Sequence, residues 1–416
     1  MTNAAQVSTS ILGKALRGAA AALALTCALA VFAAGPAQAQ TFTVLHTFTG
    51  PDGLTPYSGV TLDRGGNLYG TTYGGGASGL GTVYQLKRHG SSYIHNQIHA
   101  FTGGNDGEQP LGGLIFGPDG ALYGTTSGGG VTAGTVFTLR PPVTACHTAL
   151  CPWTETLLYD VGGFNGIQPS YGQVAFDQSG NIYGTTAFGG LQEYGDVYQL
   201  RRSGDGWTAK ELYAFGDPDA MYPGHNVVLD SAGNLYGTTD EGGAYSEGTV
   251  FQLVPSGSGW SENILVSFGV PSAGLGGFPV AGLIMDRAGN FYGGTVGDSL
   301  AASVFELSPS GTGWQIAVLH SFAISGNAEG AFGNLVLDNN GNLYGTTRSL
   351  GAYGLGNIFR LSPSGNGWTY TDLYDFTNSG DGAYPTGDLT LDSEGNIYGT
   401  NTGDASGHGV VWKLAP

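Results

Sequence analysis

The chain has 416 residues, of which 76 are Gly, 11% are aromatic and 11% are charged. Glycine usually makes up roughly 7 % of a protein, and this excess without a Gly-X-Y period excludes collagen and favours a turn-rich all-β protein. The abundant aromatic residues exclude a disordered acidic tail. The formal net charge of −18 repels phosphate backbones, so we expect no nucleic-acid partner.

The N-terminus has the pattern of an export signal. Lys14 and Arg17 precede an apolar run over residues 19–34, and Ala37-Gln38-Ala39 follows. A basic start, a short apolar run and an Ala-x-Ala site are typical of a secretory signal peptide. A membrane anchor is the alternative, but the run is shorter than the ~20 residues that span a bilayer. We therefore expect a signal peptide at residues 1–39, and a single domain at residues 40–416 that is secreted or periplasmic in a bacterium and does not insert into the membrane.

Two cysteines remain after the expected cleavage, Cys146 and Cys151. Outside the cytoplasm a disulfide is the default state of such a pair. Four residues separate the two positions, so the bridge would hold one local loop. A metal site is the alternative, for which His147 is the neighbouring ligand. We predict a disulfide between Cys146 and Cys151.

A seven-residue motif, Gly66-Asn67-Leu68-Tyr69-Gly70-Thr71-Thr72, returns along the whole chain. Its tyrosines are spaced 52 to 60 residues apart, and they are Tyr69, Tyr123, Tyr183, Tyr236, Tyr292, Tyr344 and Tyr398. A period of this length is typical of a repeat architecture. The chain is therefore expected to consist of seven copies of one structural unit.

Each copy contains four short runs of β-branched and aromatic residues separated by Gly, Asn, Asp and Pro, which is the pattern of strands. In the first copy the runs are residues 59–62, 67–72, 82–86 and 93–101. Four strands in each of seven copies predict a seven-bladed β-propeller of four-stranded antiparallel blades. The last copy ends at its third strand, residues 410–414, while an extra strand, residues 43–48, begins the domain. We predict that this N-terminal strand pairs with the C-terminal blade and closes the ring.

Three residue types recur at fixed positions of the repeat. An Asp begins the turn between the first two strands in six copies, as Asp63, Asp177, Asp230, Asp286, Asp338 and Asp392. It is expected to cap the turn, with calcium binding as the alternative. The motif tyrosine should pack between blades, with its hydroxyl bonded to the Thr pair that follows. The Trp that follows Ser-Gly-x-Gly, as in Trp207, should cover the outer face of its own blade.

Together with the segment Gly248-Thr249-Val250-Phe251-Gln252-Leu253, the Gly-Asn-Leu-Tyr-Gly-Thr-Thr motif resembles the GloVer tandem repeat of exported bacterial choice-of-anchor proteins. The resemblance covers residues 42–416. It implies an exported repeat protein with no assigned reaction, so it carries over no catalytic residue. We expect no anchor segment in this chain, a departure from the family pattern, and its copies depart locally from the motif at Gly293-Gly294-Thr295 and at Ala331.

A ligand site is expected where the copies disagree. If the first run is the innermost strand, one ring at the mouth of the central channel consists of Gly59, Gly113, Gln173, Asn226, Gly282, Asn334 and Asp388. The candidate binding residues are Gln173, Asn226, Asn334 and Asp388, with His225 beside them. They could hold a small polar ligand or a cation, or they could hydrate a water-filled mouth.

Loops at the same mouth carry Tyr57, Tyr171, Tyr222 and Tyr384 near prolines. Aromatic residues on loops suit recognition of a glycan or a protein. We therefore expect a monomeric, non-catalytic binding module without a cofactor, although a bound calcium ion stays open. A metal-assisted hydrolase or lyase at the channel mouth and a structural envelope protein are the alternatives. The histidines are scattered along the sequence, so no catalytic residue is assigned.

Overall fold

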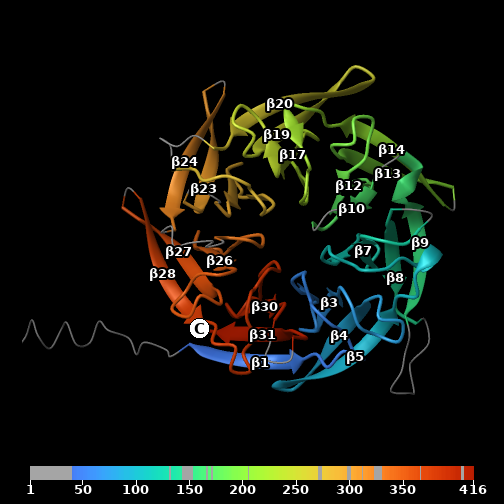
Figure 1. Ribbon diagram of the computed structural model, residues 1–416, viewed down its shortest axis with the longest axis vertical. Helices are drawn as coiled ribbons and strands as arrows, with labels where there is room; N and C mark the ends of the chain where they lie inside the picture. The colour runs from blue at the N-terminus through green and yellow to red at the C-terminus, as the bar shows by residue number, and fades with distance from the viewer. Residues whose placement is uncertain are drawn as a thin grey trace, which may run out of the picture. The chain divides into compact units, whose positions relative to one another are not determined.

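The structure is a computed structural model that describes residues 40–130, 133–142, 153–164, 167–169, 172–204, 206–269, 274–297, 301–311, 313–322, 330–365, 367–403 and 407–416. Within it, Phe42–Ala415 is one compact unit. Seven antiparallel sheets stand around a central axis in this unit (Figure 1). The predicted seven-bladed β-propeller is therefore confirmed. No helix in the described part of the chain has the length and hydrophobicity needed to cross a bilayer.

Each blade is numbered after its copy of the repeat, and its strands run from the axis outward. Blades 1 to 3 contain β2 (Thr61–Leu62), β3 (Leu68–Thr72), β4 (Thr82–His89), β5 (Ser92–Ala100); β6 (Ile115–Phe116), β7 (Leu122–Thr126), β8 (Thr135–Arg140), β9 (Thr154–Asp160); and β11 (Ala175–Phe176), β12 (Ile182–Phe188), β13 (Asp196–Ser203), β14 (Gly206–Ala214). Blades 4 and 5 contain β16 (Val228–Leu229), β17 (Leu235–Thr239), β19 (Thr249–Ser256), β20 (Gly259–Ser267); and β21 (Ile284–Met285), β22 (Phe291–Gly294), β23 (Ser303–Ser310), β24 (Gly313–Ser321).

Blades 6 and 7 contain β25 (Val336–Leu337), β26 (Leu343–Thr347), β27 (Asn357–Ser364), β28 (Gly367–Asp375); and β29 (Thr390–Leu391), β30 (Ile397–Asn401), β31 (Val410–Ala415), β1 (Thr41–Thr47). The smaller elements are η1 (Gly104–Asp106), η2 (Val161–Phe164), β10 (Ile167–Pro169), which pairs with β12, and the pair β15 (Ala220–Met221) and β18 (Glu241–Gly242). Because the strands of a blade are antiparallel, the loops after second and fourth strands share one face of the ring, here called the loop face. The hairpins after first and third strands share the other, the turn face.

The two ends of the propeller meet in blade 7, where β1 lies beside β31 at the outer edge (Figure 1). This confirms the predicted closure of the ring. Phe42 of β1 stacks on Tyr374 with ring centroids 4.0 Å apart and also contacts Phe376 and Trp412. The first strand thus bridges blades 6 and 7, and it covers the edge that β31 would otherwise expose.

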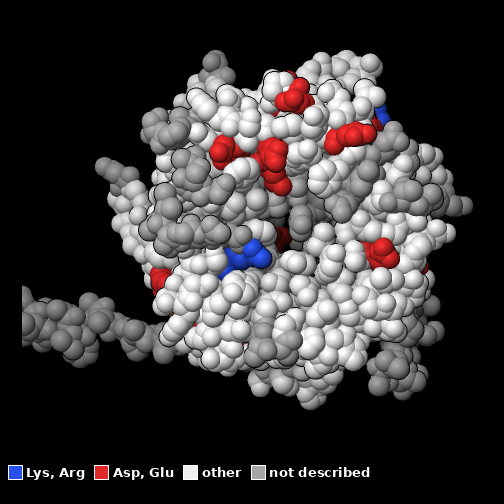
Figure 2. All heavy atoms as spheres, viewed as in Figure 1, with Lys and Arg blue, Asp and Glu red and all other residues white. Residues whose placement is uncertain are grey.

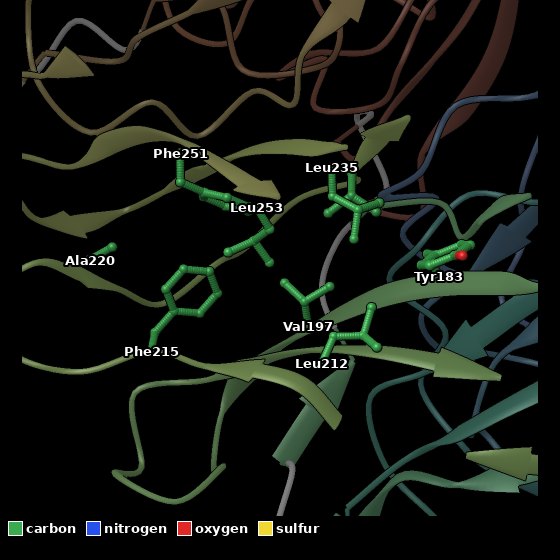
Figure 3. Packing of buried hydrophobic residues seen from close by; sticks show 9 residues of the cluster. Tyr183, Val197, Leu212, Phe215, Ala220, Leu235, Phe251 and Leu253 are labelled. Carbon is green, nitrogen blue, oxygen red and sulfur yellow. The ribbon is translucent and has the colours of Figure 1, made fainter. Parts of the chain in front are cut away.

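Hydrophobic core forms between neighbouring blades. The cluster shown in Figure 3 joins blade 3 to blade 4 and consists of Tyr183, Val197, Leu212, Phe215, Ala220, Val227, Leu235, Phe251 and Leu253. The motif tyrosine packs between blades there, as the sequence predicted. One repeated unit therefore buries its apolar faces only when a second unit lies beside it.

A contact between glycine and proline recurs at the loop face of the blade interfaces. A Cβ placed on Gly248 would lie 2.5 Å from Cδ of Pro279 in the next blade, and the φ angle of Gly248 is +94°. Glycine is required there because a side chain would strain the backbone and collide with the proline. Between blades 5 and 6 the two positions hold Ala302 and Ala331, so the loss of the proline is matched by the loss of the glycine.

One predicted side-chain partner is wrong. The Tyr69 hydroxyl donates to Asp63 Oδ2 (3.1 Å) and not to the Thr pair, because the turn Asp lies directly opposite it across the hairpin. Trp314 packs on Phe291 of its own blade and also on the motif tyrosine of the preceding blade, Tyr236, with centroids 5.6 and 5.8 Å apart.

The innermost strands are shorter than predicted, and β2 begins at Thr61, two residues later than expected. Gly59 lies against the backbone carbonyl of Asp388 in blade 7. At the crowded axis, neighbouring blades therefore touch through their backbones, and these residues leave the sheet. The predicted signal peptide (residues 1–39), the Cys146–Cys151 bridge and Tyr171 lie outside the described residues.

Candidate functional site

Three polar side chains from different blades meet where the central channel opens on the loop face. Asn334 of blade 6 donates from Nδ2 to Asn226 Oδ1 of blade 4 (3.0 Å) and to Asp388 Oδ2 of blade 7 (3.0 Å). The backbone N–H of Asn334 donates to the other Asp388 oxygen (2.8 Å). Sequence reasoning placed these three residues on one ring, and the structure brings them together by direct hydrogen bonds.

Glycines on the same ring make room for this cluster. The side-chain oxygens of Asn226 and Asn334 occupy the space that a side chain at Gly282 would need. Gln173 lies elsewhere on the ring: a Cβ on Gly113 would be 2.7 Å from its Nε2. The four predicted polar groups thus form one bonded trio and one separate amide.

The cavity beside this trio is small. It has a volume of about 30 Å³, and Tyr57, His225, Asn334 and Asp388 are among its lining residues. A cavity needs roughly 10–15 Å³ of such space for each water molecule, so this one suits about two or three ordered waters rather than an organic ligand, whose pockets begin at about 300 Å³. Burial raises the pKa of Asp388, and the hydrogen bonds from Asn334 oppose that shift. Figure 2 shows the face hollowed at its centre, with acidic side chains spread around the hollow.

His225 pairs with a carboxylate next to the cavity. Its Nε2 lies 3.7 Å from Asp240 Oδ1. Burial lowers the pKa of His225 to about 4. Burial also raises the pKa of Asp240 to about 7, and the nearby charge of Glu241 adds to this shift. At neutral pH His225 is therefore uncharged, and Asp240 is the group in this pair whose charge changes.

The turn aspartates use their oxygens within the fold. Asp63 accepts from the backbone N–H groups of Gly65 (2.8 Å) and Asn67 (2.9 Å), from Asn67 Nδ2 (2.7 Å) and from the Tyr69 hydroxyl. The same pattern recurs at Asp177, Asp230, Asp286, Asp338 and Asp392. Both carboxylate oxygens accept hydrogen bonds within the hairpin, which supports the capping role of these aspartates rather than calcium binding.

One His/Asp cluster stands at the seam where β1 meets blade 1. Ligand atoms of His46, Asp52 and His95 lie within 4.8 Å of one another. The rings of His46 and His95 stack with centroids 4.3 Å apart and planes 12° apart. Nitrogen lone pairs lie in the ring plane, so parallel rings do not converge on one ion. His46 also bonds to Asp52 as His99 does to Asp106, both at 2.9 Å, which indicates a repeated structural pair.

The predicted loop-face tyrosines have different surroundings. Tyr57 packs edge-on against Tyr73 with centroids 5.5 Å apart, and Tyr384 is 40% exposed. Tyr222 is part of a group with Phe188 and Tyr194, at centroid distances of 5.2 and 5.8 Å.

Sequence reasoning missed Phe188, which ends β12, and Leu191 and Tyr194, which lie on the loop that follows. Phe188 and Leu191 are 43% and 84% exposed. The signal was present, because Phe188 stands where four other copies have Gly: Gly74, Gly128, Gly297 and Gly403. We call Phe188, Leu191, Tyr194 and Tyr222 the aromatic patch.

Comparisons with known proteins agree with the fold. The profile of the Gloeobacter/Verrucomicrobia repeat matches residues 30–156, 150–303 and 263–416. A search of curated protein sequences finds no significant match. Among solved structures, the extracellular domain of a candidate hybrid two-component system from B. thetaiotaomicron has a TM-score of 0.54 at 15% identity, over 89% of this chain and 39% of that chain. This chain therefore spans about two-fifths of the length of that structure.

Two further solved structures are similar. A candidate 6-phosphogluconolactonase from Bacteroides uniformis has a TM-score of 0.50 at 15% identity, over 80% of this chain and 88% of that chain. A candidate oxidoreductase (glucose dehydrogenase) from Thermus thermophilus has a TM-score of 0.42 at 17% identity, over 73% of this chain and 96% of that chain. At such identities the likeness concerns the fold alone.

Proposed function

The chain belongs to the Gloeobacter/Verrucomicrobia repeat family, and we propose that it is an exported, non-catalytic module that binds a protein partner on its loop face. The aromatic patch is the observation that carries this proposal. Tyr222 contacts both Phe188 and Tyr194, and Leu191, on the same loop as Tyr194, is 84% exposed. Exposed large apolar side chains in a group are typical of interaction surfaces.

A protein partner fits this patch better than a glycan. Aromatic residues are enriched at protein–protein interfaces, and hot spots cluster where such side chains become fully desolvated. Phe188 and Leu191 offer no hydrogen-bonding group, whereas a sugar needs donors and acceptors around its ring. A glycan is the other outcome of the test, for which Tyr222 and Tyr384 would supply the aromatic rings.

Site-specific cross-linking in the producing cell tests the proposal. A photoreactive side chain at position 188 should give a discrete cross-linked protein, and Leu191→Ser should abolish that product. The matched control places the same group at position 353, where Tyr353 is 64% exposed on blade 6. Equal products from both positions would contradict the proposal. Saturable binding on a glycan array, lost in a Tyr222→Ala, Tyr384→Ala double variant, would assign the loop face to a glycan instead.

Export rests on the N-terminal pattern of Lys14, Arg17, the apolar run and Ala37-Gln38-Ala39. The mature protein should begin at Gln40 and should leave the cytoplasm. Mass spectrometry of the secreted and periplasmic fractions measures both. A chain that keeps its first residues and stays in the cytoplasm would contradict export.

A metal-assisted hydrolase or lyase at the channel mouth is the second candidate. Asp388 and His225 line the mouth cavity, which is the observation that favours it. Against it, the cavity has room for only about two or three water molecules, and donors of Asn334 engage both Asp388 oxygens. A stoichiometric metal in the purified protein that is lost in Asp388→Ala would support this candidate.

A further inference from the structure

A second cleft lies on the turn face, between blades 2 and 3, where copy 2 of the repeat departs from the others. The turn between the first two strands begins with Asp and ends with Asn in six copies, but copy 2 has Gly117 and Ala121 at these positions. In blade 3 the Asn181 side chain donates to Asp177 (2.7 Å). In blade 2 the Tyr123 ring lies where a side chain at Gly117 would stand, and its hydroxyl donates to Asp119 instead (2.9 Å). A cleft also lies between blades 3 and 4, where both turns keep Asp and Asn, so the cleft between blades 2 and 3 is distinguished by the residues that line it.

This cleft has a volume of about 290 Å³ and is here called the blade 2–3 cleft. Its lining includes Asp119, Tyr123, Phe176, Ser179, Arg202 and Trp207. Tyr123 packs edge-on against Phe176 with centroids 5.0 Å apart, and the Arg202 guanidinium lies 5.2 Å from the Trp207 ring centroid. Phe176, Trp207 and the Arg202 guanidinium therefore meet in one depression, whereas Tyr123 is buried and its hydroxyl donates to Asp119 (2.9 Å).

The cleft is locally basic in an acidic protein. Asp119 forms ion pairs with two arginines, Arg140 and Arg202, whose side chains are 46% and 62% exposed. Two cations thus face one carboxylate. Of the 13 basic residues in the chain, five stand at the ends of the third strands of blades 1 to 3: Lys87, Arg88, Arg140, Arg201 and Arg202. The copies in blades 4 to 6 have proline at the position of Arg202, namely Pro255, Pro309 and Pro363.

These groups match an acidic sugar. A guanidinium binds a carboxylate through two parallel hydrogen bonds, and an indole face packs on the C–H groups of a sugar ring. Ligand pockets begin at about 300 Å³, so the cleft has room for one or two sugar rings. The net charge of −18 opposes a densely charged polymer, because the whole surface contributes to the potential. A short acidic oligosaccharide carries few charges and meets little of that repulsion, so it is the suitable probe.

We infer that the blade 2–3 cleft binds a uronic acid unit of a polysaccharide, with Arg202 and Arg140 on the carboxylate and Trp207 against the ring. This site lies on the opposite face from the aromatic patch and does not depend on the proposed protein partner. With both sites, the module could hold a polysaccharide on one face and a protein on the other.

Calorimetric titration of the full mature chain tests the inference. The probes are trigalacturonic acid, the matched neutral galactotriose, and a triglutamate peptide. We expect saturable binding of trigalacturonic acid at least about tenfold tighter than that of either other probe, since the proposed contacts need both the ring and the carboxylate. Equal binding of the neutral sugar or of the peptide would overturn the inference, as would no binding of trigalacturonic acid.

Variants separate binding from folding. Arg202→Gln should weaken binding about tenfold or more, and Arg202→Lys should recover only part of it, because lysine keeps the charge but loses the planar fork. Trp207→Phe should weaken binding, whereas Trp260→Phe, at the same position in blade 4, should leave it unchanged. Arg360→Gln controls for net charge. If Arg202→Gln binds like the parent, or if Trp260→Phe loses as much affinity as Trp207→Phe, the cleft is not the site.

Discussion

Replacing Asp196 by threonine should stabilise the propeller in a pH-dependent way. Asp196 begins β13 and is 1% exposed, and neither of its carboxylate oxygens has a hydrogen bond among the described residues. Three other copies have Thr at this position: Thr82, Thr135 and Thr249. There the hydroxyl bonds to a Thr of the preceding strand, as Thr82 does to Thr72 (2.8 Å). In blade 3 the corresponding partner, Thr186, is already in place.

The magnitude follows from the pKa of Asp196. Burial raises this pKa from 3.8 to about 7, the charge of Glu211 adds to the rise, and the Thr186 hydroxyl opposes it. A carboxyl with a raised folded-state pKa destabilises the fold as pH increases, because the unfolded chain ionises first. The loss of folding stability begins near pH 3.8, the pKa of the carboxyl in the unfolded chain, and is complete above pH 7. Three pKa units correspond to about 4 kcal/mol, which structural relaxation reduces to about 2–4 kcal/mol.

Urea unfolding of the parent and Asp196→Thr at pH 4 and pH 8 measures the effect. The variant should gain about 2–4 kcal/mol at pH 8 and much less at pH 4. Asp196→Asn removes the charge and keeps the shape, so its gain in stability over the parent should also be larger at pH 8 than at pH 4. Blade 6 has Asn357 at this position. A gain of equal size at both pH values would refute the reasoning, because the carboxyl would then not titrate in this range.

Three other outcomes are expected from the closure, the blade interfaces and the seam. Deleting residues 41–49 should destabilise the fold by about 5 kcal/mol, since Phe42 and Phe48 lose buried contacts; an unchanged melting temperature would contradict the closure. Gly248→Ala should lower the free energy of unfolding in urea by about 2–3 kcal/mol because of its φ of +94° and the nearby Pro279. Ala302→Gly should lower it by less than about 1 kcal/mol. Equal losses would show that the contact between glycine and proline does not require glycine. Burial lowers the pKa of His95 to about 4, so the folded state loses stability as pH falls from 6.5 toward 4. His95→Tyr should remove about 1–2 kcal/mol of that loss. If the free energy of unfolding falls equally between pH 6.5 and pH 4 in the parent and the variant, the reasoning is wrong.

The architecture was predictable because the repeat carries it. Seven copies of four strands, with an unmatched strand at residues 43–48, leave one way to close the ring, and β1 beside β31 is that closure. The Tyr69–Asp63 bond was missed, although six residues across a short hairpin place the two side chains opposite each other. That error came from choosing the nearest hydroxyls in sequence instead of the partner across the turn.

The candidate site was predictable only in part. Comparison of the same innermost-strand position in all seven copies identified Asn226, Asn334 and Asp388, and the structure brings these three residues together. That Asn334 reaches both partners across the axis depends on the radius of the channel, which no repeat pattern gives. The group of Phe188 with Tyr222 depends on the path of the loop after β12, where Gly189 and Gly190 have φ angles of +84° and +73°. Such glycine-directed loop paths are not encoded in strand periodicity.

Two departures from the repeat show how structural changes differ from functional ones. Where Pro is lost at Ala331, the facing Gly is also lost at Ala302, so the interface keeps its close contact. At Gly117 and Ala121 the compensation is partial: Asp119 accepts from the Tyr123 hydroxyl and the Ala121 N–H, but no Asn side chain joins it. Arg140 and Arg202 pair with Asp119 beside a cleft of about 290 Å³. A departure that only preserves packing should be matched across the interface, because neighbouring blades share one core. A departure that gathers arginines beside a cleft does not serve packing, and for that reason the turn face of blades 2 and 3 is the place to look for a ligand.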